Sequence, residues 1–326
     1  WMGVKHASLV SKRWQVETGE MIKDLIRHIE NSKLLRNRII AYMVGGGIYG
    51  EWHYHGAYYL PDLSKPMVER CKYVPGDERT RTSYGLLRNP QNEGKIIQFF
   101  KCYHNGVADA LLYFAKIVKR ETKGRVICGV YYTYLLENLF IQEAGHLVPE
   151  RILSSKYIDF IACPYTYQEG NFEGVKRGES DIYDESGNWL GRARGVAGDG
   201  GYRILLESLK RHGKLFFSEI DPATHLDPQP RVEGGSGSRT VYGTLKILQR
   251  DIGKALVLGC AGWLCDLGPY YSNVCWYDDK PIINQVRELI KFGNIRKNAD
   301  ISSVSEISAV YDAKSFFVTV HWRADR

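Results

Sequence analysis

The stretch RIIAYMVGGGIYGEW at residues 38–52 decides the fold that the sequence predicts. Its apolar residues are continuous and do not alternate with polar ones, which is typical of a parallel strand buried on both faces. Comparable strand-like runs are found at 125–131, 157–163, 214–219 and 255–260. Segments with helical periodicity lie among them, at 20–31, 95–122, 201–212, 239–251 and 281–292. This alternation predicts an α/β fold with a parallel sheet.

The connections between the predicted elements are unequal in length. Long segments follow the strands, at 52–94 and 164–200, whereas a helix returns to its strand through a short turn such as 211–213. Long loops at one end and tight turns at the other are typical of a (β/α)8 TIM barrel, whose functional residues lie in the loops after the strands. A doubly wound sheet is the alternative.

The character of the sequence changes after Phe292. Residues 294–303 are polar and turn-like, and 306–311 and 315–320 then have the pattern of two strands. We therefore expect two domains, with residues 1–292 in the barrel domain and residues 293–326 at the beginning of a second, non-catalytic domain.

The composition is that of an ordinary soluble protein. Of the 326 residues, 44% are hydrophobic and 25% are charged, and no apolar run is long enough to span a membrane. The net charge of +7 is small for this length and the basic residues are dispersed, which argues against a nucleic-acid partner. The seven cysteines lie mostly in apolar runs and lack metal-ligand spacing. They are predicted to be buried free thiols, which favours a reducing, cytoplasmic compartment.

Glu51 and Glu219 each stand at the end of an apolar strand. At the position of Glu219 a charged group is costly unless it is solvated or hydrogen-bonded, so a functional role is favoured there over a structural ion pair. Glu51 becomes a candidate through its pairing with Glu219. Two carboxyl groups at neighbouring strand ends are the minimum needed to hydrolyse a glycosidic bond. One acid protonates the leaving oxygen while the other carboxylate meets the developing oxocarbenium ion. We expect the two groups to lie about 5–6 Å apart, the spacing of a retaining mechanism.

Aromatic and polar side chains near the same strand ends are candidates for contact with a sugar. Flat rings can stack on sugar faces, and carboxylate and imidazole groups can bind hydroxyls. The predicted substrate-binding residues are Trp52, Tyr132, Tyr165, Tyr167, Asp221, His225, Trp263 and Asp266. The expected partner is an oligosaccharide or glycoside substrate. We predict no metal site and no cofactor.

The order of these residues resembles a known family of enzymes. The motifs are Ser8 and Ser11 before Trp14, then Gly50-Glu51-Trp52, Ser218-Glu219-Ile220-Asp221, and Gly262-Trp263 ahead of Asp266. Together they resemble the clan A retaining glycoside hydrolases, and within that clan the family 42 β-galactosidase-like barrels. The resemblance covers roughly residues 5–290.

The resemblance implies a chain truncated at both ends, with barrel strands four to eight present and strands one to three upstream of Trp1. It implies that Glu51 is the acid/base and Glu219 the nucleophile of a double displacement. The clan usually has an asparagine before the acid/base, where this chain has Gly50, so the contact to the sugar 2-hydroxyl must come from elsewhere. The sequence leaves open whether the full-length protein forms a homo-oligomer.

Two alternatives remain open at this point. Glu219, Asp221 and His225 have a spacing that permits a metal-dependent barrel hydrolase or isomerase, although no second strand offers paired ligands. Gly50 keeps open a non-catalytic carbohydrate-binding barrel that has lost its acid. Sensitivity to a chelator would identify the first alternative, and failure to trap a glycosyl-enzyme would identify the second.

Overall fold

The computed structural model describes residues 6–53, 62–76, 79, 87–136, 142, 144–165, 181–183, 189–192, 201–228, 240–300 and 302–319. The chain divides into two compact units. Unit 1 comprises Trp1–Ile161, Glu207–Lys214 and Ala309–Arg326, and unit 2 comprises Ala162–Leu206 and Leu215–Ser308. Each unit is described by itself.

The described elements of unit 1 are α1 (Lys12–Asn31), β1 (Ala41–Met43), the 3-10 turn η1 (Ile48–Gly50), α2 (Lys65–Cys71), α3 (Gly94–Glu121), β2 (Ile127–Tyr131), α4 (Pro149–Leu153) and η4 (Ala313–Phe317). Those of unit 2 are β4 (Asp181–Tyr183), β5 (Trp189–Arg192), β6 (Leu215–Ile220), α6 (Val241–Val257), β7 (Ala261–Leu264), α7 (Gly268–Tyr271) and α8 (Lys280–Arg296). Two elements include residues of both units, β3 (Phe160–Pro164) and α5 (Leu206–Arg211).

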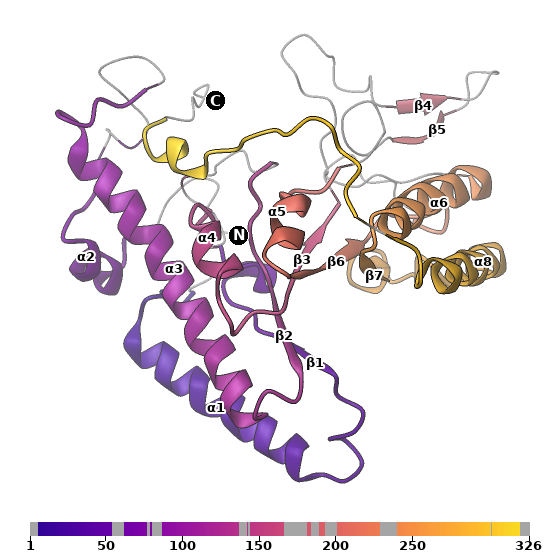
Figure 1. Ribbon diagram of the computed structural model, residues 1–326, viewed down its shortest axis with the longest axis horizontal. Helices are drawn as coiled ribbons and strands as arrows, with labels where there is room; N and C mark the ends of the chain where they lie inside the picture. Colours follow the sequence, from indigo (N-terminus) through magenta and orange to yellow (C-terminus); the bar gives the residue numbers. More distant parts are fainter. Residues whose placement is uncertain are drawn as a thin grey trace. The chain divides into compact units, whose positions relative to one another are not determined.

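α3 supplies much of the core of unit 1, and α1 packs along it (Figure 1). α1 begins after Ser11, whose side chain accepts a hydrogen bond from the backbone N–H of Trp14 and so caps the helix. The two helices can approach closely at Gly19, where a Cβ atom would lie 2.9 Å from the side chain of Ile117. Trp14 packs edge-on against Phe114 of α3, with ring centroids 5.3 Å apart.

The described strands form a five-stranded parallel sheet in the order β1-β2-β3-β6-β7, and β4 and β5 form a separate antiparallel pair. In unit 1 Tyr42 of β1 is in register with Cys128 of β2. In unit 2 Glu219 of β6 is in register with Trp263 of β7. The α/β class expected from the sequence therefore holds for the described residues.

The predicted (β/α)8 TIM barrel is wrong. Within the described residues β1 and β7 stand at the two ends of the strand order, and the sheet is open. β1 has three residues and β7 four, so these end strands offer few backbone groups for further pairing. A barrel requires that the last strand pair with the first, with a fixed stagger between neighbouring strands. The alternation of strands and helices predicts parallel pairing, but it does not predict closure.

Two local predictions near the C-terminal side are also wrong. The run 255–260 belongs partly to α6, which continues to Val257, and the strand β7 begins only at Ala261. Residues 306–311 and 315–320 are predicted to be strands, but the described residues 302–319 contain no strand: they contain η4 and one isolated bridge, from Thr319 to Leu87. The turn of η4 is stabilised by the Asp312 side chain, which accepts from the backbone N–H of Lys314. The domain boundary at residue 292 stays a prediction, although Ala309–Arg326 groups with unit 1.

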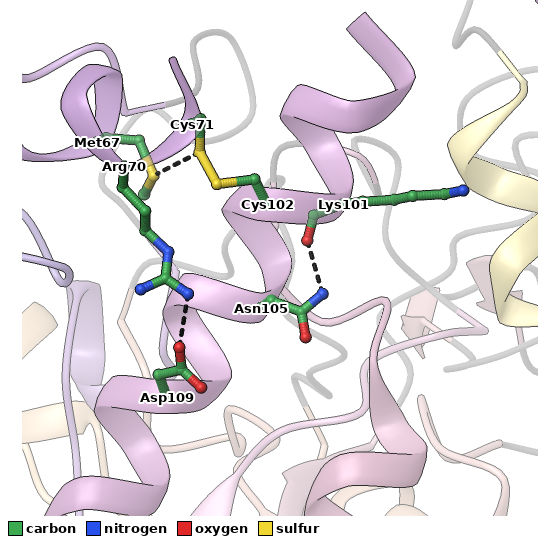
Figure 2. The surroundings of a disulfide bond; sticks show 7 residues. All are labelled: Met67, Arg70, Cys71, Lys101, Cys102, Asn105 and Asp109. Atoms are coloured by element: carbon green, nitrogen blue, oxygen red, sulfur yellow. Dashed lines mark hydrogen bonds and ion pairs between the residues drawn. A yellow bond between two sulfur atoms is a disulfide. The ribbon is translucent and has the colours of Figure 1, made fainter. Parts of the chain in front are cut away.

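The prediction of buried free thiols is wrong for one pair of cysteines, which forms a disulfide, and for three of the free cysteines, which are not buried. Cys71, the last residue of α2, is disulfide-bonded to Cys102 of α3, with Cα atoms 5.6 Å apart (Figure 2). The free cysteines are Cys128 and Cys163, which are buried, Cys260 and Cys265, which are partly exposed, and Cys275, which is exposed. Disulfides are typical of oxidising environments, so the cysteines no longer favour a reducing compartment.

Candidate functional site in unit 1

Glu51 lies in a tight turn that follows β1. The turn begins at Gly47, which has φ 72° and ψ −155°, and Tyr49 and Trp52 also have positive φ values of 54° and 60°. The Trp52 indole N–H donates to the carbonyl of Val44 over 3.0 Å, which anchors the turn to the end of the strand. Non-glycine residues with positive φ are uncommon and tend to mark functional sites when several occur together.

The carboxyl group of Glu51 is held at both oxygens. The hydroxyl of Tyr134 donates to Oε1 over 3.0 Å, and Nε2 of His53 lies 3.0 Å from Oε2. The Glu51 side chain is 15% exposed and that of His53 is 4% exposed. The carboxyl group is therefore oriented by protein donors but is still accessible from outside the core.

The backbone of Glu51 is held by a second histidine. Nε2 of His146 lies 2.9 Å from the carbonyl oxygen of Glu51, while Nδ1 accepts from the backbone N–H of Tyr134 over 3.3 Å. A carbonyl can only accept and a backbone N–H can only donate, so the proton of the neutral ring must be on Nε2. His146 thereby joins the Glu51 turn to the segment after β2.

Tyr132 packs beneath this histidine, with ring centroids 4.4 Å apart. Its hydroxyl donates to the carbonyl of Gly145 over 2.8 Å, and the residue is buried. Trp52 is also fully buried, with 0% exposed area. Both residues were predicted to contact a sugar. The structure gives them packing roles beside Glu51, and a sugar contact by either ring stays an untested prediction.

The segment that contains His146 is fixed from inside by His104 of α3. Nδ1 of His104 accepts from the backbone N–H of Leu147 over 2.8 Å, and Nε2 donates to the carbonyl of Gln142 over 2.8 Å. From the other side the Gln142 amide donates to the carbonyls of Phe316 and Thr319 in the C-terminal segment. The C-terminal segment thus supports the Glu51 site indirectly.

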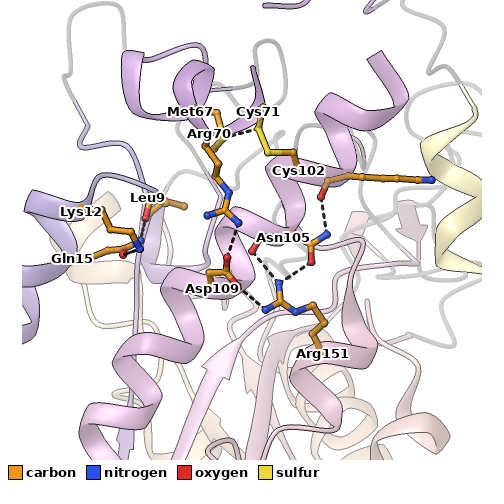
Figure 3. Close-up of polar contacts among 11 residues, drawn as sticks. Leu9, Lys12, Gln15, Met67, Arg70, Cys71, Cys102, Asn105, Asp109 and Arg151 are labelled. Carbon is orange, nitrogen blue, oxygen red and sulfur yellow. Dashed lines mark hydrogen bonds and ion pairs between the residues drawn. A yellow bond between two sulfur atoms is a disulfide. The ribbon is translucent and has the colours of Figure 1, made fainter. Parts of the chain in front are cut away.

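Salt bridges fix the helices around the same segment. Asp109 of α3 accepts from Arg70 of α2 and from Arg151 of α4, each over 2.6 Å (Figure 3). Arg151 also donates to the side-chain oxygen of Asn105 over 2.7 Å. Burial on its own would raise the pKa of Asp109, but the hydrogen bonds and charges of Arg151 and Arg70 together outweigh it and lower the pKa. This cluster, next to the disulfide, fixes α2 and α4 on α3.

Stability should fall at acidic pH because of His104. Burial lowers the pKa of its imidazole from 6.5 to about 4. Between these values the unfolded chain binds a proton that the folded chain does not, so stability is lost as the pH falls from about 6.5 to about 4. The expected loss is about 3 kcal/mol, since each pKa unit is worth about 1.4 kcal/mol.

Denaturant unfolding across this pH range should be measured for the parent protein and for His104→Gln. The free energy of unfolding should depend less steeply on pH in the variant. Equal slopes would contradict the assignment, and an NMR titration of the imidazole gives its midpoint directly.

Predicted site residues in unit 2

Glu219 lies near the end of β6, and its neighbour in register on β7 is Trp263. Asp221 follows directly after β6 and is buried. Burial, and then the negative charges of Glu219 and Asp221, raise the pKa of the Cys265 thiol to about 12. Glu219 of β6 and Asp221 directly after it are therefore close enough to affect one thiol, and Trp263 of β7 is in register with Glu219.

Several other predicted residues of unit 2 make contacts that stabilise loops. Nε2 of His225 pairs with Asp279 over 2.9 Å, and its Nδ1 lies 3.2 Å from the hydroxyl of Thr244. One carboxyl oxygen of Asp266 accepts from the backbone N–H groups of Gly268 and Trp276. These contacts do not test whether either residue also binds substrate.

Tyr165 is buried, and its ring packs edge-on against Tyr202 with centroids 5.1 Å apart. The guanidinium of Arg250 lies 5.7 Å from the centroid of the Tyr165 ring. Tyr167 lies outside the described residues. A sugar contact by either tyrosine stays a prediction.

The structure groups the predicted site residues by unit. Unit 1 brings together Glu51, Trp52 and Tyr132, and unit 2 contains Glu219 with Tyr165, Asp221, His225, Trp263 and Asp266. The separation of the two glutamates stays a prediction because they belong to different units. Sequence reasoning missed His53 and His146. His53 could have been found from its position two residues after Glu51, whereas His146 has no local signal.

Among the described residues, no group of three or more His, Cys, Asp or Glu side chains is arranged to hold a metal ion. None of the described helices is both long enough and apolar enough to cross a membrane. No protein-family model, curated protein or solved structure matches the chain.

Proposed function

We propose that the chain is a retaining, β-galactosidase-like glycoside hydrolase in which Glu51 is the acid/base and Glu219 is the nucleophile. The observation that carries the proposal is the carboxyl group of Glu51. It is largely buried and bound at both oxygens, by Tyr134 and His53, in a turn with several unusual backbone angles. A general acid must present its proton in one direction, and fixed hydrogen bonds supply that orientation.

The position of Glu219 supports the second role. Glu219 lies one residue before the end of β6, and its partner in register on β7 is Trp263, which carries an indole of the kind that can form a platform for a sugar ring. In the proposed reaction Glu219 attacks the anomeric carbon while Glu51 gives its proton to the leaving oxygen. Water then attacks the glycosyl-enzyme, and the Glu51 carboxylate accepts the proton of that water.

Covalent trapping tests this proposal. Incubation with an activated 2-deoxy-2-fluoro-β-galactoside should add one fluorosugar to the protein, because the fluorine slows both formation and hydrolysis of the intermediate while the activated leaving group keeps its formation fast. Peptide mass spectrometry should place the label on Glu219, and the Glu219→Gln variant should remain unlabelled. A non-catalytic carbohydrate-binding protein would bind galactosides without labelling. Absence of label with a panel of 2-fluoro glycosides would contradict the proposed mechanism.

A further inference from the structure

We propose that His53 is a positioning residue that orients the carboxyl group of Glu51 and stabilises the carboxylate formed when Glu51 gives up its proton. This inference rests on the proposed role of Glu51 as acid/base. It assigns a part in that chemistry to His53, which is not among the site residues predicted from the sequence.

The backbone of His53 is fixed relative to Glu51 by the turn itself. Its carbonyl oxygen accepts from the N–H of Ile48 over 2.7 Å, and the N–H of Trp52 donates to Gly46 over 2.7 Å. These two bonds close the turn on either side of Glu51. The positive φ of Trp52, 60°, reverses the chain so that residue 53 comes back toward residue 51. The imidazole can therefore reach the carboxyl group only two residues away.

The side chain of His53 is fixed as well. It is 4% exposed, and its ring lies 6.3 Å from that of His146, which holds the Glu51 backbone. A buried imidazole with little room to rotate keeps Nε2 at one place, 3.0 Å from Oε2 of Glu51. A carboxylate oxygen can only accept, so Nε2 is the donor whenever Glu51 is ionised.

The two donors bind different oxygens of the Glu51 carboxyl group. Tyr134 donates to Oε1 and His53 to Oε2. In the first step the O–H bond of Glu51 breaks, its electron pair stays on the carboxylate, and the proton bonds to the leaving oxygen. In the second step the carboxylate takes a proton from the attacking water. His53 keeps its own proton throughout, so its role is to orient the carboxyl group and to stabilise its negative charge.

Leaving-group dependence tests this role. His53→Ala should lower kcat/KM about 10- to 100-fold on a glycoside with a poor leaving group, the loss expected for one hydrogen bond to a charged group. On an aryl glycoside with an acidic phenol the first step needs little protonation, so the loss of kcat/KM should be several-fold smaller. His53→Gln should recover much of the activity, because the amide nitrogen of glutamine can donate from nearly the same position. His28→Ala, at an exposed histidine of α1, is the matched control.

Glu51→Ala, measured on the same two substrates, separates this inference from the proposed function. If Glu51→Ala loses activity selectively on the poor leaving group and His53→Ala does not, the role of His53 is wrong and that of Glu51 stands. If Glu51→Ala itself shows no selectivity, the acid/base assignment fails. Equal losses on both substrates in His53→Ala, or failure of both His53 variants to fold by circular dichroism, would show a purely structural role and overturn the inference.

Discussion

Glu219→Gln should lose nearly all turnover on every glycoside, whereas Glu51→Ala should lose activity selectively. Glutamine keeps the shape of the side chain but has no carboxylate to attack the anomeric carbon, so the quality of the leaving group cannot compensate. Removing Glu51 removes proton donation, which is worth about 10²- to 10⁴-fold. The full loss is expected on unactivated glycosides. An aryl glycoside with an acidic phenol should instead keep a fast first step and accumulate the glycosyl-enzyme.

Azide provides the decisive measurement for Glu51→Ala. In this variant hydrolysis of the glycosyl-enzyme still lacks the base that accepts a proton from water. Azide is a nucleophile that needs no such base. Added azide should therefore restore turnover and, from a β-glycoside, yield a β-glycosyl azide. Glu69→Gln, on the exposed face of α2, should behave like the parent protein. Equal losses on good and poor leaving groups with no azide effect would show that Glu51 is not the acid/base.

The class of the fold could be predicted from the sequence because burial of parallel strands has a local signature. The apolar run 214–219 became β6, and the periodic segment 95–122 became α3, within a residue at each end. The strand predicted at 255–260 is wrong for a local reason. Its first three residues are the last turn of α6, and the helix ends just before Gly259, which has φ 70° and adopts the left-handed conformation that follows many helices. Apolar character alone does not separate these two environments.

Two features could not be predicted from the sequence: whether the sheet closes into a barrel, and which cysteines form a disulfide. Both depend on partners that are distant in the chain. Nothing in the pattern of residues 38–45 shows whether a strand pairs on one side or on both. Cys71 and Cys102 are 31 residues apart and meet only because α2 packs on α3. Neither cysteine belongs to a short motif that would indicate its partner.

The candidate site shows the same division between local and distant information. Glu51 was found from its place after an apolar, glycine-rich strand. Its partners Tyr134 and His146 lie 83 and 95 residues further along the chain. The position of Tyr134 shortly after the predicted strand 125–131 can be read from the sequence, but its contact with Glu51 cannot. Hydrogen bonds that orient a carboxyl group are set by tertiary packing, which single-sequence periodicity does not record.

Gly47→Ala should disable the Glu51 site more severely than substitution of any other described glycine of unit 1. Gly47 has φ 72° and ψ −155°, a region that is essentially restricted to glycine. A Cβ atom there would lie 2.0 Å from the carbonyl oxygen of His53, which is backbone and cannot rotate away. The turn must therefore open, which breaks the hydrogen bond from Ile48 to His53 and displaces Glu51. We expect a cost of about 1–3 kcal/mol from the backbone angles alone, with the steric clash in addition.

Two other glycines separate the causes of this effect. Gly124 has φ 74° with no atom within 4 Å of the added Cβ, so Gly124→Ala should show only the backbone penalty of about 1–2 kcal/mol. Gly94, the first residue of α3, has open space around its Cβ position and an ordinary φ, so Gly94→Ala should be neutral or slightly stabilising.

Thermal unfolding and the rate of hydrolysis of an unactivated glycoside are then measured for all three variants. Gly47→Ala should have both the lowest unfolding temperature and the lowest rate. Activity in particular should fall for Gly47→Ala alone, because only this substitution moves the residue that donates the proton. If Gly47→Ala matched Gly124→Ala in both stability and activity, the tight turn would not be what places Glu51.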